Sequence, residues 1–279
     1  MERSPRLRVF AGPNGSGKSI MKQQVMRTEV SGRPVNLGVY VNADEIAAIL
    51  RKRRRLDLST YQVQADRKSF LRFAYGSGLL SRRFPKHRML VEHRIDGSVF
   101  VLTNGRHLEH FAQLIAACLC ERLLERRIQF SFETVFSHAS KLALMARAQK
   151  AGYKVYLYFI ATNSPEINVD RVRIRVDSGG HNVPRTKIID RYGKSLAKLL
   201  PAIELCYHAF IFDNSTAFEG GTGEPLMFAE MKQTSTGLNW AWDTQRIPDW
   251  FIRAYLIASG KAVYLDIART VIAERSPGR

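Results

Sequence analysis

The chain has 279 residues, 45 % hydrophobic and 24 % charged, a composition typical of a globular protein that can bury a sizeable core. No run approaches about 18 apolar residues, and the charged start leaves no room for a signal peptide, so we expect a cytoplasmic protein without a membrane partner. The formal net charge of +18 is compatible with a solvated basic face, an anionic substrate, a nucleic acid or an acidic partner protein.

The first predicted strand, residues 7–11, leads into a sequence of the form G-x-x-x-x-G-K-[ST], followed by a helix start at 21–26. This phosphate loop consists of Gly12, Pro13, Asn14, Gly15, Ser16, Gly17, Lys18 and Ser19. Its backbone N–H groups can surround phosphate oxygens, Lys18 can reach the β- and γ-phosphates, and the Ser19 hydroxyl can ligate Mg²⁺. The pattern predicts binding of a nucleoside triphosphate, ATP or GTP.

The second strand, 38–42, ends at Asn42, and Asp44 follows. Asp44 either caps the next helix or faces the phosphate loop as a general base that accepts a proton from a substrate hydroxyl. Both interpretations stay open on local grounds.

A basic stretch occupies residues 51–127 and holds 13 basic and three acidic residues between 51 and 94. Within it, residues 89–103 predict a β-hairpin that turns at Asp96-Gly97, and residues 107–127 predict an amphipathic helix. The three cysteines, Cys118, Cys120 and Cys206, have no metal-ligand spacing, and we expect buried thiols.

The third strand, 130–133, ends at Glu133 and Thr134, which could hold a substrate hydroxyl or water-bridged Mg²⁺ or simply be solvated. The fourth strand covers 154–161. The segment 171–191 predicts two helices that are separated by Gly179-Gly180, and it carries the arginines Arg171, Arg175, Arg185 and Arg191. Arginines beside such a hinge are typical of a lid that closes over polyphosphate, although a basic surface hairpin would look similar.

The fifth strand, 209–213, ends in Asp213-Asn214-Ser215, where no Glu follows the Asp. We therefore expect contact with the nucleotide base or a plain turn rather than a motor ATPase. A Gly-rich loop at 220–223, a strand at 226–231 and helices at 248–258 and 263–273 complete the chain.

Five strands that alternate with helices predict an α/β fold of the P-loop NTPase type, with a parallel sheet of about five strands flanked by helices. Polar residues follow each strand, as expected of a site at the carboxyl edge of a sheet. We expect a P-loop domain at 1–215, with a basic insertion at 51–127 and a lid at 171–191, and a C-terminal extension at 216–279 packed on this core.

Five motifs occur in this order along the chain: the phosphate loop, VNADEIA, FSFET, a GY-x-V strand and RV-x-x-RV-x-x-GGH-x-VP. In this combination the chain resembles the zeta-toxin-like P-loop kinases over about residues 6–215. The resemblance implies phosphoryl transfer with Mg²⁺ to a small anionic acceptor such as UDP-N-acetylglucosamine, and a small acidic antitoxin as partner. The resemblance implies that Lys18 and Ser19 bind the nucleotide and Mg²⁺, that Asp44 is the general base, and that Glu133 and Thr134 contact the acceptor. Arg175 and Arg191 match lid positions that stabilise the transferring phosphoryl group. Arg171 and Arg185 are candidate substrate-side contacts from the lid, and Asn42, at the end of its strand, is a further candidate acceptor contact.

This chain departs from the family pattern at three places. Ile20 replaces a usual Thr, Asp190 replaces a basic residue beside Arg191, and the stretch 51–127 is longer and more basic than the family's helical link. Two other functions therefore stay open: a nucleic-acid-end kinase that uses the basic stretch, which the missing nucleic-acid module disfavours, and a nucleotide-gated binding module.

Overall fold

The computed structural model describes residues 4–30, 32–64, 66–180, 182–215 and 224–275. The chain divides into two compact units, Met1–Asn36 with Thr134–Arg279 (unit 1) and Leu37–Glu133 (unit 2). The predicted Gly-rich loop at 220–223 and the His of the lid motif, His181, lie outside the described residues.

The sheet of unit 1 contains three of the predicted strands and extends beyond them. Its strand order is β12-β11-β10-β9-β1, in which β1, β9 and β10 are parallel, while β11 and β12 add antiparallel strands at one edge. Its strands are β1 (Arg6–Ala11), β9 (Lys154–Ala161), β10 (His208–Asp213), β11 (Leu226–Thr234) and β12 (Gly237–Trp242). The apolar runs that predicted β1 and β9 are buried almost throughout, as parallel strands covered on both faces require.

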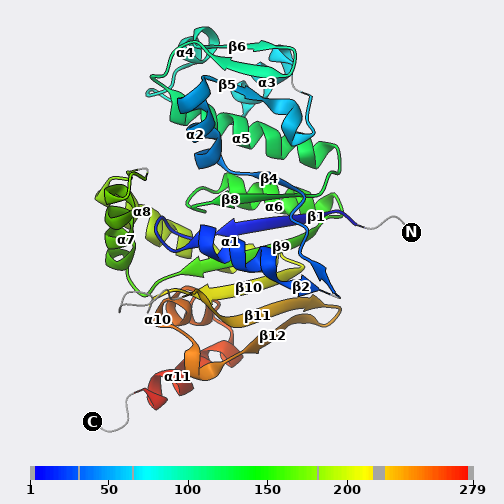
Figure 1. Cartoon of the computed structure of the whole chain (residues 1–279). Helices are drawn as coiled ribbons and strands as arrows, with labels where there is room; N and C mark the ends of the chain where they lie inside the picture. Colours follow the sequence, from blue (N-terminus) through cyan, green and yellow to red (C-terminus); the bar gives the residue numbers. More distant parts are fainter. Residues whose placement is uncertain (1–3, 31, 65, 181, 216–223, 276–279) are drawn as a thin grey trace. The chain divides into compact units, whose positions relative to one another are not determined.

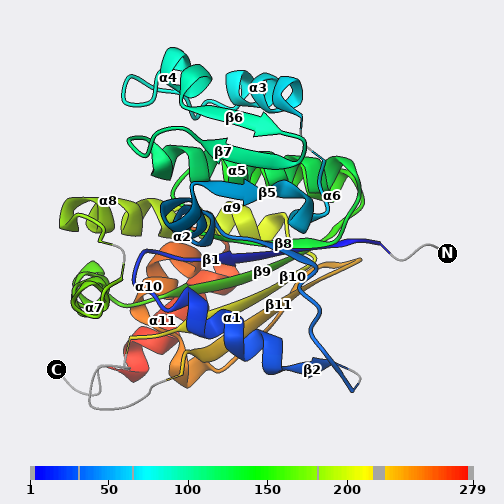
Figure 2. The same cartoon turned by 45° about the horizontal axis from the view of Figure 1, so that its top comes forward.

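Helices cover both faces of this sheet. Figure 2 shows α1 in front of the strands and α10 and α11 behind them. The helices of unit 1 are α1 (Lys18–Arg27), α6 (Ser140–Lys150), α7 (Pro165–Asp177), α8 (Arg185–Leu196), α9 (Leu199–Glu204), α10 (Asp249–Phe251) and α11 (Ala262–Glu274). A 3₁₀ turn, η2 (Thr244–Arg246), precedes α10, a π-helix, η3 (Ile252–Ile257), follows it, and β2 (Glu29–Val30) pairs with β3 (Arg33–Pro34).

The lid segment forms the expected helical pair. Helix α7 contains Arg171 and Arg175, the chain turns at Gly179 with φ +84°, and Pro184 caps α8. Figure 1 shows α7 and α8 side by side. Buried Val172, Val183 and Ile188 form the apolar contact between the two helices.

Unit 2 contains the other two predicted strands, β4 (Val39–Val41) and β8 (Phe130–Thr134), which pair in parallel up to Phe132. A separate antiparallel sheet has the order β5-β7-β6, formed by β5 (Arg55–Asp57), β7 (Val99–Leu102) and β6 (His93–Asp96). Its helices are α2 (Ala43–Arg53), η1 (Leu58–Tyr61), α3 (Arg67–Gly76), α4 (Lys86–Val91) and α5 (Leu108–Glu125). Helix α5 contributes eleven buried residues to the core of this unit.

The predicted α/β fold and all five strands are confirmed, and every pairing found among those strands within a unit is parallel. The hairpin does turn at Asp96-Gly97, but residues 89–91 end helix α4 rather than extend its first strand. The three cysteines are free and buried, as expected. Among the described residues, no helix combines the length and apolar composition that a bilayer-spanning segment needs.

Candidate active site

The phosphate loop connects β1 to α1 in a conformation that requires glycine. Gly12 has φ +151°, and a Cβ there would lie 2.0 Å from the Ile160 carbonyl oxygen. Gly17, at φ +100°, is the N-cap of α1, and a Cβ there would lie 2.4 Å from the Asn214 amide nitrogen. The backbone can therefore pass close to β9 and to the end of β10 only without these side chains.

Lys18 is buried and folds back over the loop. Its Nζ donates to the carbonyl oxygens of Gly12 (3.0 Å) and Pro13 (2.8 Å), and the Ser16 hydroxyl donates to the same Pro13 oxygen (2.9 Å). No acidic residue lies in the first turn of α1, so no carboxylate there opposes the positive end of the helix and the Lys18 ammonium, and the loop is suited to bind an anion.

Two buried asparagines hold the loop from outside. Asn168 on α7 donates from Nδ2 to the Asn14 carbonyl (2.7 Å), and Asn214 after β10 donates to the Ser16 carbonyl (2.8 Å). The sequence predicted a base contact or a plain turn for Asp213-Asn214, and it gave no signal for Asn168. Both side chains act instead as braces of the loop backbone.

Arg171 belongs to the same network. Its Nη2 donates to the Asn214 carbonyl oxygen at 2.6 Å, which ties the first lid helix to the segment that braces the phosphate loop. Burial lowers the pKa of the Arg171 guanidinium, and the Asp213 carboxylate opposes that shift. The Asp213 carboxylate itself accepts hydrogen bonds from the Trp250 indole (2.8 Å) and the Ser215 hydroxyl (2.7 Å).

The other lid arginines are more open. Arg175 and Arg185 are exposed, and Arg191 is half-buried on α8. Its neighbour Tyr192 anchors α8, because the Tyr192 hydroxyl donates to the Thr162 carbonyl at the end of β9 (2.5 Å). Burial raises the pKa of Tyr192 to about 12.

In unit 2, the residue that caps α2 is Asn42, whose Oδ1 accepts the Asp44 backbone N–H at 2.8 Å. The interpretation of Asp44 as the helix cap is therefore wrong. Asp44 is the second residue of α2 and is exposed, and its carboxylate forms no hydrogen bond or ion pair with the residues that the structure describes. The Asp44 carboxylate is open to solvent and therefore accessible to a ligand.

Glu133 is bound by two side chains from the neighbouring strand end. The Tyr40 hydroxyl donates to Glu133 Oε2 at 2.9 Å, and Asn42 Nδ2 lies 3.3 Å from the same oxygen. Burial, and after it the Glu133 carboxylate, raises the pKa of Tyr40. The sequence named Asn42 and Glu133 as separate candidates but missed Tyr40, whose place at the end of an apolar strand looked structural. Thr134 bonds locally, since its hydroxyl accepts the Phe136 N–H (3.0 Å).

The residues of the phosphate loop fit a nucleotide with Mg²⁺. The Ser19 side chain is exposed at the second position of α1, and no group of three His, Cys, Asp or Glu residues suited to a metal occurs in the described part of the chain. The loop offers an ammonium and backbone N–H groups to phosphate oxygens, and one hydroxyl to a metal ion. Such a set suits a magnesium ion held mainly by phosphate oxygens, with Ser19 as protein ligand.

Comparison with known families gives one family match. Residues 83–215, just under half of the chain, match the family described as Zeta toxin. The matched stretch contains Glu133, Thr134 and the lid, and it begins after the phosphate loop and Asp44. The match confirms the predicted resemblance.

A curated relative covers a shorter stretch. A Haemophilus influenzae protein described as uncharacterized is 35 % identical over 69 residues, 25 % of this chain and 49 % of that protein. The chain therefore spans about half the length of this relative.

Two solved structures are similar at low identity. One belongs to the PezAT chromosomal toxin-antitoxin system of Streptococcus pneumoniae, with 15 % identity, 76 % of this chain and 69 % of that chain covered, and a TM-score of 0.43. The other is an AvrRxo1-ORF1:-ORF2 structure with ATP, with 12 % identity, 82 % and 59 % covered, and a TM-score of 0.46.

Proposed function

We propose that this chain is a zeta-toxin-like P-loop kinase, which transfers the γ-phosphate of ATP or GTP to a hydroxyl group. The match of residues 83–215 to the Zeta toxin family supports this proposal. The observation that carries the proposal is the phosphate loop, because its backbone is hydrogen-bonded by two asparagines, Asn168 and Asn214, that lie in the matched stretch. Asn168 donates a hydrogen bond to the Asn14 carbonyl. Asn214 donates to the Ser16 carbonyl, and the Asn214 carbonyl in turn accepts a hydrogen bond from Arg171.

The nucleotide side of the reaction is assigned to unit 1. The loop N–H groups and Lys18 bind the β- and γ-phosphates, and the Ser19 hydroxyl ligates Mg²⁺, which supplies neutralisation of phosphate charge when bound. Arg175 and Arg191 stabilise the transferring phosphoryl group, while Arg171 and Arg185 contact the substrates from the lid. Arginine suits this task because its guanidinium can donate two parallel hydrogen bonds to phosphate oxygens.

The acceptor side is assigned to unit 2 and the residue that follows it. Asp44 accepts the proton of the attacking hydroxyl, and Asn42, Glu133 and Thr134 hold the acceptor. The hydrogen bonds from Tyr40 and Asn42 support a fixed position for the Glu133 carboxylate, which can then accept from sugar hydroxyl groups. The proposed acceptor is a small anionic molecule of the nucleotide-sugar class, such as UDP-N-acetylglucosamine.

Partner and compartment follow from the same family. We propose a small acidic antitoxin as the protein partner, which the net charge of +18 would attract, and a cytoplasmic location.

Transfer of label from γ-labelled ATP with Mg²⁺ tests the proposal. The acceptors are UDP-N-acetylglucosamine, other nucleotide sugars and a short oligonucleotide, with Lys18→Gln as the control for loop-dependent transfer. We expect label on a nucleotide sugar. Label on the oligonucleotide would favour a nucleic-acid-end kinase, and ATP binding without any labelled acceptor would favour a nucleotide-gated binding module.

A further inference from the structure

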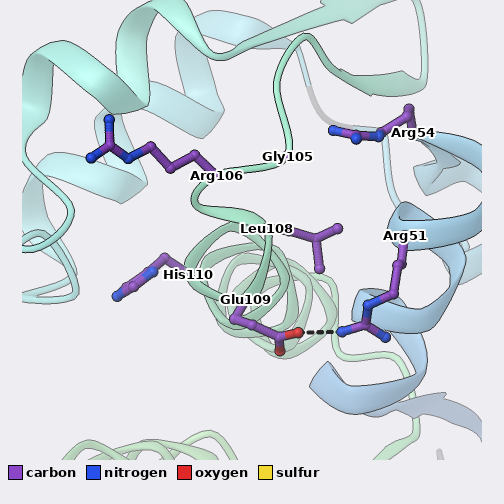
Figure 3. A pocket seen from close by; sticks show the side chains of 7 residues that line it. All are labelled: Arg51, Arg54, Gly105, Arg106, Leu108, Glu109 and His110. Atoms are coloured by element: carbon purple, nitrogen blue, oxygen red, sulfur yellow. Dashed lines mark hydrogen bonds and ion pairs between the residues drawn. The ribbon is translucent and has the colours of Figure 1, made fainter. Parts of the chain in front are cut away.

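A basic cavity of about 310 Å³ lies within unit 2, outside the groups assigned above. It is lined by Arg51, Arg54, Gly105, Arg106, Leu108, Glu109 and His110 (Figure 3). This volume is at the small end of the range of ligand sites, roughly 300–1,000 Å³. Three arginines and one carboxylate around so small a space point to an anionic ligand.

The charges around the cavity do not cancel. Arg51 forms an ion pair with Glu109, so these two neutralise each other. Arg54 and Arg106 have no ion pair among the residues that the structure describes, which leaves two guanidinium groups for a ligand. Each can donate a forked pair of hydrogen bonds to one phosphate.

The backbone adds to this positive potential. Helix α5 begins at Leu108 beside the cavity, and its N-cap residue, His107, forms no side-chain cap. The N–H groups in the first turn of an 18-residue helix carry the positive end of the helix dipole. Glu109 lies in that turn and offsets part of the potential, but its carboxylate is already paired with Arg51.

The Arg54 side chain lies against the backbone at Gly105, and both its own backbone conformation and that glycine contribute to this position. It ends α2 with φ +56°, a conformation that L residues other than Asn and Asp adopt infrequently. Figure 3 shows its side chain directed toward Gly105, where an added Cβ would lie 2.3 Å from Arg54 Nη1. Gly105 does not have a left-handed φ, so glycine at this position is explained by the space it leaves for the guanidinium.

We infer that this cavity is a phosphate-binding site, separate from the phosphate loop, that takes a phosphate or pyrophosphate group of a ligand. Arg54 lies ten residues beyond Asp44 on the same helix, about 15 Å along its axis. One phosphate therefore cannot touch both residues, and a ligand that reached both would be about the length of a nucleotide sugar or of two to three nucleotides. The inference does not rest on the kinase reaction.

Titration calorimetry of the full chain with pyrophosphate tests the site. We expect Arg54→Gln to weaken binding about tenfold, the loss of a hydrogen bond between charged groups. The matched control is Arg53→Gln, the same change at the exposed neighbouring residue that does not line the cavity, and it should leave affinity within about twofold.

Gly105→Ala separates position from charge, because a Cβ there would displace the Arg54 guanidinium without removing it. We expect a loss similar to that of Arg54→Gln with little change in thermal stability, since the displaced atoms are the end of a flexible side chain. Lys18→Gln should keep this binding. The inference is overturned if Lys18→Gln abolishes all pyrophosphate binding, or if Arg53→Gln and Arg54→Gln act equally.

Two further titrations identify the source of the phosphate. UDP binding with the affinity of pyrophosphate, sensitive to Arg54→Gln, would identify a small phosphate-bearing molecule. Tighter binding of a single-stranded oligonucleotide would identify a nucleic-acid backbone if it also weakens steeply with salt. A plot of the logarithm of the binding constant against the logarithm of the salt concentration has a slope of about −0.7 for each phosphate contact, so several contacts would give a several-fold steeper slope. Insensitivity of both ligands to Arg54→Gln would contradict the site.

Discussion

The phosphate loop of unit 1 and two exposed charged residues of unit 2, Asp44 and Arg54, are built in opposite ways. In the loop, the carbonyls of Gly12, Asn14 and Ser16 accept hydrogen bonds from buried side chains. In unit 2, Asp44 and Arg54 are exposed and have no ion pair with described residues. The difference indicates that the backbone of the phosphate loop is preorganised by the protein, while the charges of Asp44 and Arg54 remain accessible to a ligand.

This comparison has an energetic basis. A loop whose backbone is already bonded loses little conformational freedom when phosphate binds, so its binding energy is not spent on ordering. An exposed carboxylate or guanidinium stays hydrated until a ligand replaces the water.

Asp44→Asn should give the largest effect on turnover. We expect phosphoryl transfer to fall by about 10²–10⁴-fold, the usual contribution of a general base. The matched control is Glu45→Gln, the neighbouring exposed carboxylate on α2, which should stay within about threefold of the wild-type rate. Initial rates with γ-labelled ATP measure both, and equal losses in the two variants would remove Asp44 from the role of base.

Asn214→Ala should have a smaller effect that is confined to the nucleotide. Loss of the 2.8 Å bond to the Ser16 carbonyl leaves a buried acceptor without that donor, and we expect ATP affinity to fall roughly tenfold. Acceptor KM should not change. A variant with normal nucleotide affinity would show that the brace is not needed to form the loop.

The smallest expected effect is that of Tyr192→Phe on the thermal stability of the protein at alkaline pH. Its pKa is raised from about 10 to about 12 in the folded protein, so its contribution to stability is full below pH 10 and is lost as the pH rises from 10 to 12. Tyr192→Phe removes this contribution along with the bond to Thr162. We expect the variant to have a lower Tm at pH 8 but a shallower fall in Tm between pH 10 and 12, measured by circular dichroism.

The phosphate loop could be predicted because its chemistry lies in eight consecutive residues. The strands were equally visible, since buried parallel strands appear as short apolar runs. The braces could not be found in this way. Asn168 and Asn214 contact residues 154 and 198 positions away, and an isolated asparagine has no local pattern that distinguishes a brace from a turn.

Unit 2 was less predictable for a related reason. Asn42 and Asp44 are both preferred cap residues, so the sequence could not decide which of them caps α2. Strand β5 and helices α3 and α4 are short, and their periodicity is hard to distinguish from that of loops. The meeting of Arg54 with Gly105 depends on two segments about fifty residues apart, and only the fold brings them together.

The central claim is that Lys18 binds the nucleotide while Asp44 takes part only in the reaction with the acceptor. Parallel titrations of Lys18→Gln and Asp44→Asn with a non-hydrolysable ATP analogue and Mg²⁺ test it most directly. The account predicts that Lys18→Gln weakens nucleotide binding at least about tenfold, because it removes a buried ammonium from the loop. It predicts that Asp44→Asn binds the analogue as the wild type does. Nucleotide affinity lost in the Asp44 variant and kept in the Lys18 variant would contradict the account.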